Sequence, residues 1–449
     1  MIQLFKRPLY ILQLENYNLK RFLRIMIRQP FSRGAARQKI VWTPKLVSIF
    51  ILGLLIEIMV AWDMARVFNT PWNAVAFVLW ILILSGAFTV MVTMAVIIFW
   101  PVDFVAKQVI IRRAQSKIKK LKKLKIIGIT GSYGKTTMKE ALAAILSVKF
   151  KVLKTPDSVN TPVGISRLIL SELNPSTSSG PAAEVFIVEM GAYRRGDIKA
   201  LCKIARPDVA VLTGINEAHL ERFGSMENTI KTKFEIVQNA APDALIVLNN
   251  DDKLVRENYR FFIGARGIKF YKATEQDLDH PPVSVLGEYI WGVINGCVII
   301  ARQLGLADEE IRRGIAEIKP VPHRLQLVRD SGGITVIDDS YNGNPDGARE
   351  AIKVLAKYTD KRKIYITPGL VEAGERTAAI HHKIGEQLNA AADLVILIKN
   401  SATPYIAEKL QKDKIMWFES AAAAHNALGK ILKPGDVILF QNDWPDNYL

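Results

Sequence analysis

The stretch KIIGITGSYGKTTMKEALAAILSVKF, residues 125–150, decides the fold of this chain. It opens with a short apolar run of the kind that forms a buried strand, and it closes with apolar residues at helical spacing. Between them, GSYGKTT contains two glycines, a lysine and two threonines. A strand, a glycine-rich turn and a helix in this order predict a phosphate-binding loop at the start of an α/β domain.

Each residue type in such a loop has its own task. Gly131 and Gly134 let backbone N–H groups surround phosphate oxygens at a helix N-terminus. Lys135 supplies charge to the outer phosphates, and Thr136 can ligate Mg²⁺. The spacing departs from the strict GxxxxGK[ST] form, because Ile129 stands five residues before Gly134. The expected ATP-binding loop consists of Gly131, Ser132, Tyr133, Gly134, Lys135, Thr136 and Thr137.

Two apolar runs precede this loop. Residues 46–62 are apolar apart from Glu57, and residues 74–100 contain no charged residue. A membrane span takes about 20 residues, so we expect two transmembrane helices, with a buried helix as the alternative for the first run. An ionisable residue within such a run often has a function, and Glu57 is a candidate for one. The alternative is that Glu57 is merely tolerated where two helices pack together.

The positive charge lies beside these runs. The net charge is +17; residues 1–45 hold ten Lys or Arg against Glu15, and residues 101–125 hold nine against Asp103. Anionic lipid headgroups explain this pattern better than nucleic acid does. We therefore expect membrane lipids and no nucleic acid as partners, and an inner-membrane protein whose two flanks and catalytic domains are cytoplasmic.

Further apolar runs, at 185–189, 209–213 and 245–249, alternate with helical patterns, which predicts a parallel α/β sheet. Residues 10–29 mix apolar and basic positions at helical spacing, typical of a helix on a membrane surface or of a solvated basic helix. The expected divisions are a basic amphipathic cytoplasmic segment (1–45), two transmembrane helices (46–100), a basic linker (101–124), a central ATP-binding domain (125–320) and a C-terminal domain (321–449).

Several motifs now stand in a recognisable order. The loop begins TGSYGKTT; AHLERFG at 218–224 is followed by Lys233, nine residues after Gly224; and DDSYNGNP occupies 338–345. Over roughly 125–449 the chain resembles the Mur ligase family, most closely the MurF-type members that add D-alanyl-D-alanine to a muramoyl tripeptide. The resemblance implies an ATP-dependent peptide ligase of peptidoglycan-type precursor synthesis, with a P-loop-type central domain and a Rossmann-like C-terminal domain.

The resemblance also implies residue roles. It gives ATP and two Mg²⁺ ions as cofactors, with Thr136, Glu189, His219 and Lys233 as metal ligands and Lys233 as a possible carbamate. It gives Lys135, His219, Lys233 and Arg324 as catalytic residues, and Asn249, Arg324 and Asp339 as further ATP contacts. It places Asn160, Thr161, Asn342 and Asn344 at the two substrates, a muramoyl-peptide acceptor and an amine or dipeptide donor. Read alone, Glu189 and Lys233 could be solvated residues, and Asp251 and Asp252 could simply cap a turn.

In the mechanism implied by the resemblance, the acceptor carboxylate attacks the γ-phosphate of ATP to give an acyl phosphate, which the amine then attacks to form an amide. Closure of the C-terminal domain onto the central one would position the groups and exclude water.

The chain departs from the family in three places. Residues 1–124 leave no room for the family's UDP-binding domain, so UDP is held differently or the acceptor is lipid-linked. ITPGLVEAGE at 366–375 and the terminus after 435 also differ, which leaves the amine donor open. His382 lies near a histidine common in the family, whereas we expect His381 to be a surface residue.

Two other functions remain open. A catalytically silent, membrane-anchored nucleotide-binding scaffold would explain the departures, and a ligase of the folylpolyglutamate type would share the phosphate loop. The combination of Lys135, Thr136, Glu189, His219 and Lys233 favours a working ligase over the scaffold. DDSYNGNP and the apolar N-terminal runs are not expected in a folylpolyglutamate-type ligase.

Overall fold

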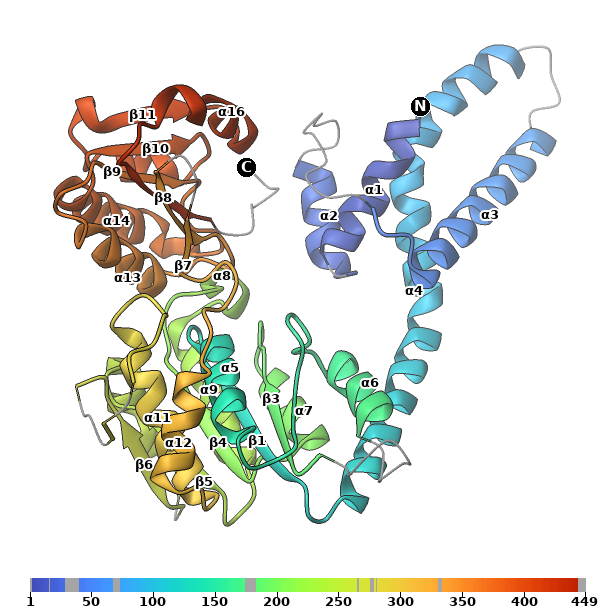
Figure 1. Ribbon diagram of the computed structural model, residues 1–449. Helices are drawn as coiled ribbons and strands as arrows, with labels where there is room; N and C mark the ends of the chain where they lie inside the picture. The colour runs from blue at the N-terminus through green and yellow to red at the C-terminus, as the bar shows by residue number, and fades with distance from the viewer. Residues whose placement is uncertain are drawn as a thin grey trace. The chain divides into compact units, whose positions relative to one another are not determined.

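The computed structural model describes residues 2–15, 17–28, 40–67, 73–173, 183–264, 266–274, 278–279, 281–329 and 333–442. The chain divides into two compact units, Met1–Val109 and Ile110–Asn447, which are described separately. Figure 1 shows the helices of the first unit and the two α/β sheets of the second.

The first unit is built from helices. They are α1 (Ile2–Leu14), α2 (Leu19–Arg28), α3 (Pro44–Val67) and α4 (Asn73–Lys120), the last of which continues into the second unit. Leu12, Phe22, Leu46 and Phe88 are among the residues of a shared apolar core that joins all four helices. An ion pair between Lys45 and Asp103 (2.8 Å) adds a polar link between α3 and α4.

The two apolar runs lie within α3 and α4, and many of their large side chains face outward. These exposed residues include Ile51, Leu55, Ile58, Met59, Trp62, Met94, Ile97, Ile98 and Trp100. Within the described residues, the segment Phe88–Lys120 is long and apolar enough to cross a membrane, judged by length and composition alone. The side chains of residues 64–87, including Arg66, lie outside the described part.

The segment that we expected to be a basic linker is helical as far as Lys120, because α4 runs through Pro101 without ending. The physical reason is an apolar stripe among the basic residues: Ile111, Ala114 and Ile118 pack against the core of the central α/β domain. Packing of that stripe favours a helix over this basic segment.

The central domain has a six-stranded parallel sheet in the order β2-β3-β1-β4-β5-β6. Its strands are β1 (Lys125–Thr130), β2 (Val152–Lys154), β3 (Val185–Glu189), β4 (Val209–Leu212), β5 (Leu245–Asn249) and β6 (Ile268–Tyr271). Its helices are α5 (Lys135–Leu146), α6 (Pro162–Glu172), α7 (Asp197–Ile204), α8 (Leu220–Phe223), α9 (Met226–Asn239), α10 (Lys253–Asn258), η1 (Tyr259–Phe261), α11 (Tyr289–Gln303) and α12 (Asp308–Ala316).

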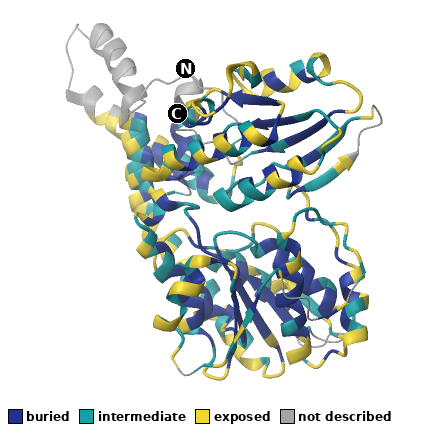
Figure 2. Cartoon of the chain, turned by 90° about the vertical axis from the view of Figure 1, so that its left-hand side faces the viewer, coloured by how far each residue is buried: buried dark blue, intermediate teal, exposed yellow. Residues whose placement is uncertain are grey.

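Helices cover both faces of this sheet. Apolar residues of α6, α7 and α9 form one core with one face of the strands, and those of α5, α11 and α12 form a second core with the other. Strand β1 is buried from Ile126 to Thr130, as expected for a parallel strand between two layers. Figure 2 shows these buried strands between partly exposed helices.

The C-terminal domain has a second six-stranded sheet, in the order β11-β10-β9-β12-β8-β7. Only β7 (Gln326–Arg329) among its described strands runs antiparallel, pairing with β8 (Thr335–Asp339). The others are β9 (Lys363–Thr367), β10 (Leu394–Ile398), β11 (Ile415–Phe418) and β12 (Val437–Gln441). The covering helices are α13 (Pro345–Ala356), η2 (Gly374–Arg376), α14 (Thr377–Ala391), α15 (Thr403–Ala407), η3 (Lys412–Lys414) and α16 (Ala421–Ile431).

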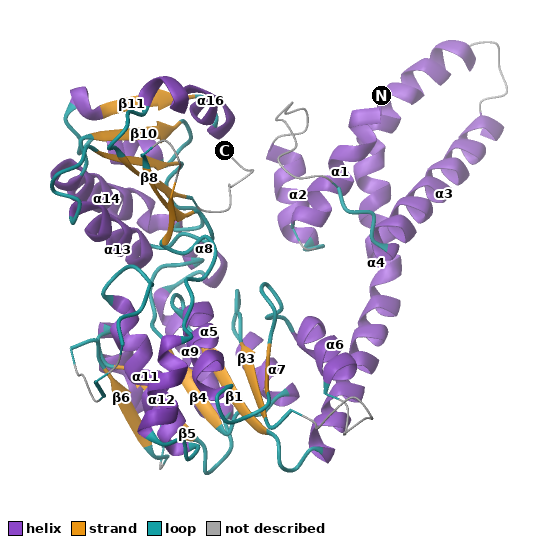
Figure 3. Ribbon diagram, in the orientation of Figure 1, coloured by secondary structure: helices purple, strands orange, loops and turns teal. Residues whose placement is uncertain are grey.

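The α/β class that the sequence predicts is confirmed by both sheets (Figure 3). They lie on opposite sides of the predicted division at 320/321. Because the strands of the central sheet are parallel, the loops after β1, β3, β4 and β5 all emerge at one edge, which is where an open α/β sheet places its site.

Candidate active site

The loop after β1 is shaped by close backbone approach. Gly134 precedes α5 in a left-handed conformation (φ 74°). A Cβ atom on Gly131 would lie 2.0 Å from Thr213 Oγ1, so no other residue fits there. The Ser132 N–H donates to the carbonyl of Gly214 at 2.8 Å. The loop after β4 therefore holds the phosphate loop in shape at the N-terminus of α5.

Tyr133 belongs to this support and not to the open face of the loop. Its hydroxyl donates to Asp252 Oδ2 at 2.7 Å, and the same carboxylate oxygen accepts the N–H of Ile215 at 2.8 Å. Asp252 also caps α10 by accepting the N–H of Val255. Asp252 thus caps a helix, in line with the capping alternative that the sequence left open for it.

Lys135 lies over the phosphate loop, with Nζ donating to the carbonyl of Gly131 at 2.9 Å. Burial lowers the pKa of Lys135, and the carboxylate of Glu189 opposes that shift. Arg324, from the C-terminal domain, lowers the same pKa and places Nη2 3.4 Å from Thr136 Oγ1. Two cations therefore converge where phosphate oxygens would lie.

Glu189 ends β3 beside the loop, as the sequence predicts. Its Oε2 accepts a hydrogen bond from Thr136 Oγ1 at 3.1 Å, and its backbone N–H donates to Thr155 Oγ1 at 3.0 Å. The carboxylate is buried. Its placement beside a phosphate-loop threonine suits the binding of a divalent cation, which prefers oxygen ligands.

Lys139 was not among the residues expected at this site, yet its side chain is fully buried (0% exposed) one turn beyond Lys135. Its Nζ lies 3.3 Å from Asp157 Oδ1, 3.4 Å from Glu140 Oε1 and 3.4 Å from Glu189 Oε2. Its spacing of four residues from Lys135 puts both lysines on one side of α5, and this was the available signal. Lys139 links Glu189 to the loop that carries Asn160 and Thr161.

His219 begins α8 in a left-handed conformation (φ 60°). Its Nδ1 lies 2.6 Å from Glu372 Oε2, and its ring packs edge-on against Tyr193 with centroids 4.9 Å apart. Burial lowers the pKa of His219 against the opposing hydrogen bond to Glu372. A neutral imidazole that donates from Nδ1 keeps a lone pair on Nε2, the form that binds metals.

Lys233 lies on α9 and is buried, with Nζ 5.5 Å from the centroid of the Phe223 ring. Burial lowers its pKa well below the ordinary value, and the neighbouring charge of Lys135 acts in the same direction. This environment increases the fraction of unprotonated amine at neutral pH. A surface position for Lys233 is therefore wrong.

Arg324 and Asp339 meet where the C-terminal domain begins. The Arg324 guanidinium lies 5.1 Å from the centroid of the Tyr341 ring. Asp339 ends β8 and its Oδ1 accepts the N–H of Leu325 at 3.2 Å. Burial raises the pKa of Asp339 to about 7.

The four expected substrate residues lie in two groups. Thr161 caps α6 by accepting the N–H of Gly164, and the carbonyl of Asn160 accepts the N–H of Gly191 at 3.3 Å. Asn344 caps α13 and accepts from the Asn216 amide at 2.9 Å, while Asn342 is left-handed (φ 50°).

The side chain of Asn249 forms hydrogen bonds to backbone groups of the protein. Its amide donates to the carbonyl of Thr213 at 2.8 Å, and its Oδ1 accepts the N–H of Asp251 at 3.0 Å. These bonds tie β5 to the loop after β4. These contacts give Asn249 a structural role at the expected edge of the sheet.

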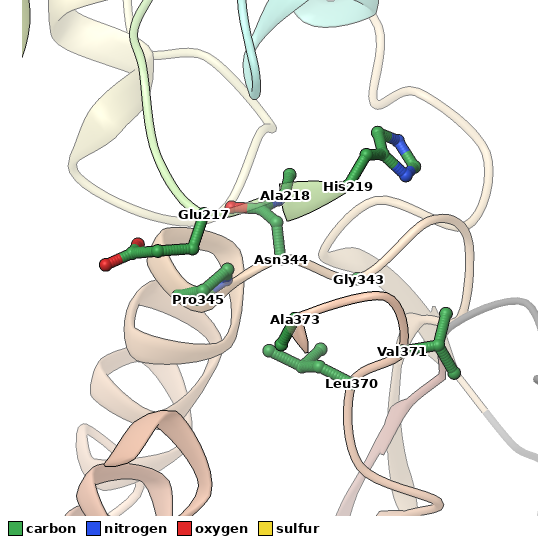
Figure 4. A pocket seen from close by; sticks show the side chains of 9 residues that line it. All are labelled: Glu217, Ala218, His219, Gly343, Asn344, Pro345, Leu370, Val371 and Ala373. Atoms are coloured by element: carbon green, nitrogen blue, oxygen red, sulfur yellow. The ribbon is translucent and has the colours of Figure 1, made fainter. Parts of the chain in front are cut away.

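The two α/β domains meet above this edge. Ser158 and Tyr341 join their hydroxyls at 2.8 Å, and Glu217 pairs with Arg376 at 3.6 Å. Figure 4 shows a pocket lined by both domains, whose lining residues are Glu217, Ala218, His219, Gly343, Asn344, Pro345, Leu370, Val371 and Ala373. Its volume of about 10 Å³ is the room of roughly one water molecule.

The expected surface position of His381 is wrong. It is fully buried (0% exposed), with Nε2 accepting the N–H of Leu370 at 2.8 Å and Nδ1 2.7 Å from the carbonyl of Thr377. It shares the apolar face of α14 with Ile380, Ile384 and Leu388, a helical period that the sequence contained. His382 instead is half-exposed and pairs with Glu408 at 2.7 Å.

A metal ion would draw on mixed ligands here. Among the residues that the structure describes, no three His, Cys, Asp or Glu side chains form a metal-binding group. Glu189 with Thr136, and the Nε2 of His219, offer the donor types that the resemblance implies. The adjacent oxygens of Glu189 and Thr136 suit a divalent cation that takes its other ligands from nucleotide oxygens, water or further side chains.

The fold and this site define an ATP-dependent ligase. Residues 129–278 match the Mur ligase middle domain, and residues 323–441 match the Mur ligase glutamate ligase domain. The chain belongs to the Mur ligase family.

Named relatives agree with this assignment. UDP-N-acetylmuramoyl-tripeptide--D-alanyl-D-alanine ligase of Bacillus subtilis is 25% identical over 338 residues, covering 70% of this chain and 72% of the relative. The enzyme of that name from Mycobacterium tuberculosis is 31% identical, covering 58% of this chain and 55% of its own. A MurF ligase from Thermotoga maritima, solved with ADP, has a TM-score of 0.65 at 29% identity and covers 75% of this chain and 80% of its own.

We predict that Lys139→Met lowers the free energy of unfolding by roughly 3–5 kcal/mol, because it leaves the buried carboxylate of Glu189 without this cation. Lys154→Met is the matched control: Lys154 also pairs with Glu140, but its side chain is 42% exposed. That change should cost less than about 1 kcal/mol. Chemical denaturation of the full chain measures both, and equal costs would contradict a special role for the buried lysine.

Proposed function

We propose that this ligase joins D-alanyl-D-alanine, or a similar amine, to the carboxylate of a muramoyl peptide during peptidoglycan synthesis. The observation that carries the proposal is the contact between Arg324 of the C-terminal domain and Thr136 of the phosphate loop. It brings both domains to one nucleotide site, as a ligase that shields a reactive intermediate requires. The substrates in this proposal are those that the names of the relatives state.

The reaction has two steps. An acceptor carboxylate oxygen attacks the γ-phosphorus of ATP, the bond to the β-phosphate oxygen breaks, and ADP leaves with that electron pair. The amine nitrogen of the donor then attacks the acyl carbon of the acyl phosphate. Phosphate departs, the nitrogen loses a proton to solvent, and an amide remains.

The side chains at the site suit this chemistry. The first step brings a carboxylate to a triphosphate, and Lys135 and Arg324 offset the repulsion between their negative charges. Backbone N–H groups at the N-terminus of α5 bind phosphate oxygens. The loops of Asn160 and Asn344 lie on the two domains that would enclose the acyl phosphate, which keeps water from it.

Mg²⁺ would be held by Thr136, Glu189, His219 and Lys233, with two ions sharing these ligands. When bound, Mg²⁺ supplies positive charge to the phosphate oxygens. The chain's own part is to orient the ligands: Lys139 holds Glu189, and Glu372 holds His219.

The buried amine of Lys233 suits modification to a carbamate. The unprotonated amine attacks the carbon of CO₂, loses a proton and becomes an anionic oxygen ligand. Lowering of its pKa by burial favours the form that reacts.

We predict a carbamate carbon signal in the ¹³C NMR spectrum of the protein incubated with ¹³C-bicarbonate, absent from Lys233→Ala. The control is Lys231→Ala, two residues away, because Lys231 is 42% exposed and pairs with Glu227. A signal that persists in Lys233→Ala would assign the carbamate elsewhere, and no signal in the parent protein would refute it.

The first unit would anchor this enzyme to the inner membrane with its catalytic domains in the cytoplasm. Two features support this anchoring. The apolar side chains of α3 and α4 face outward, and helix α2 is amphipathic and basic. Membrane lipids are the proposed partners: acyl chains for the apolar faces and anionic headgroups for the basic residues.

We predict that the full chain, expressed in bacteria, stays in the membrane fraction after a carbonate wash at high pH, which releases peripheral proteins. It should remain there in 1 M salt, since apolar burial and not charge retains it. Release by carbonate would contradict a span, and release by salt alone would leave only electrostatic attachment to lipid.

The ligase reaction itself is testable by ATP-dependent phosphate release from the full chain in detergent or nanodiscs. D-Ala-D-Ala is offered with UDP-linked or lipid-linked muramoyl tripeptide. We expect turnover with one acceptor, lost in Lys135→Ala, because that change removes charge from the phosphate site. The acceptor that works identifies the carrier. ATP binding without turnover on any acceptor would favour the silent scaffold.

A further inference from the structure

Glu372 lies in ITPGLVEAGE, one of the stretches in which this chain departs from its family. It belongs to the loop between β9 and η2 of the C-terminal domain, and its side chain is 7% exposed. Its contacts reach the central domain: Oε2 lies 2.6 Å from His219 Nδ1, and Oε1 accepts from Arg222 Nε at 2.5 Å. Its carbonyl accepts the N–H of Glu221 at 3.0 Å.

Hydrogen bonds within the C-terminal domain hold the loop that leads to Glu372. His381 accepts the N–H of Leu370 at 2.8 Å, and Thr367 Oγ1 accepts the N–H of Gly369 at 2.8 Å. Glu372 itself is left-handed (φ 57°), a conformation that costs free energy in a residue with a Cβ atom. The C-terminal domain thus holds the carboxylate of Glu372 against α8 of the central domain.

Both carboxylate oxygens of Glu372 are paired with nitrogen atoms of the central domain. Oε1 accepts from the guanidinium of Arg222, and Oε2 faces Nδ1 of His219. An ionised carboxylate accepts only, so the hydrogen on His219 lies on Nδ1 and the lone pair on Nε2. His219 also meets Tyr193, which itself lies 4.7 Å from the Arg222 guanidinium carbon.

We infer that Glu372 is a positioning residue that orients His219 from the opposite domain, so that Nε2 is aimed for metal only when the two α/β domains are together. This inference rests on the proposed role of His219 as a metal ligand. A carboxylate behind a ligating imidazole fixes its tautomer and ring orientation. Here that carboxylate comes from another domain, so metal affinity and closure become linked.

The test compares Glu372→Gln with Arg376→Gln in the full chain. Arg376 forms the neighbouring interdomain ion pair with Glu217 but does not touch His219. Mn²⁺ binding in the presence of ADP, followed by electron paramagnetic resonance of the free ion, should weaken roughly 10- to 100-fold in Glu372→Gln. Arg376→Gln should stay within about twofold of the parent protein. An equal loss in both variants, or none in Glu372→Gln, would overturn the inference.

A second variant distinguishes loss of the positioning role from misfolding. Glu372→Asp keeps the charge that pairs with Arg222 but is one methylene shorter, so it should fold and still weaken Mn²⁺ binding. In a His219→Ala background, Glu372→Gln should cause no further loss, since its effect passes through the imidazole. A further loss would show a general structural role and refute the inference.

His219→Ala also separates the two proposals. If it leaves Mn²⁺ affinity unchanged, the proposed metal ligand itself is wrong. If it weakens binding while Glu372→Gln does not, only the positioning role fails.

Interdomain distance provides a readout independent of metal affinity. Spin labels at Lys253→Cys and Lys399→Cys, both surface sites, avoid the buried Cys202 and Cys297. Adding Mg²⁺ and ADP should narrow the distance distribution in the parent protein and not in Glu372→Gln. The same narrowing in both proteins would contradict the proposed link between metal binding and domain closure.

Discussion

Strand β1 pairs in parallel with β3 on one side and with β4 on the other. This ladder determines where the chemistry lies, because parallel strands all end at the same edge. The phosphate loop follows β1, Glu189 ends β3, and Thr213 follows β4 against Gly131. A shift in register would separate the lysine, the carboxylate and the loop that supports them.

Charge inside this site is balanced over more than one element. Lys139 neutralises carboxylates from β3 and from the loop after β2, while Glu372 neutralises Arg222. Buried charges are tolerated only with partners of opposite sign. The phosphate loop and α8 are therefore placed by ion pairs as well as by apolar packing, and these pairs tie the acceptor loop and the C-terminal domain to the nucleotide site.

The division of labour between the two α/β domains follows from their contacts. The central domain provides the phosphate loop, Glu189, His219 and Lys233, and the C-terminal domain provides Arg324 and Glu372. Neither domain alone has both cations near the phosphates and an oriented histidine. This arrangement suits chemistry whose intermediate must not meet water.

The sequence by itself determined the α/β class, the phosphate loop and the positions of Glu189 and His219, because local patterns and motif order encode these features. It could not reveal that Lys139 pairs with carboxylates on other elements, or that Glu372 pairs with His219. Those depend on contacts between residues far apart in the chain: 153 positions separate His219 from Glu372. The helical form of the basic segment at the end of α4 has the same cause, since this segment packs against the central core.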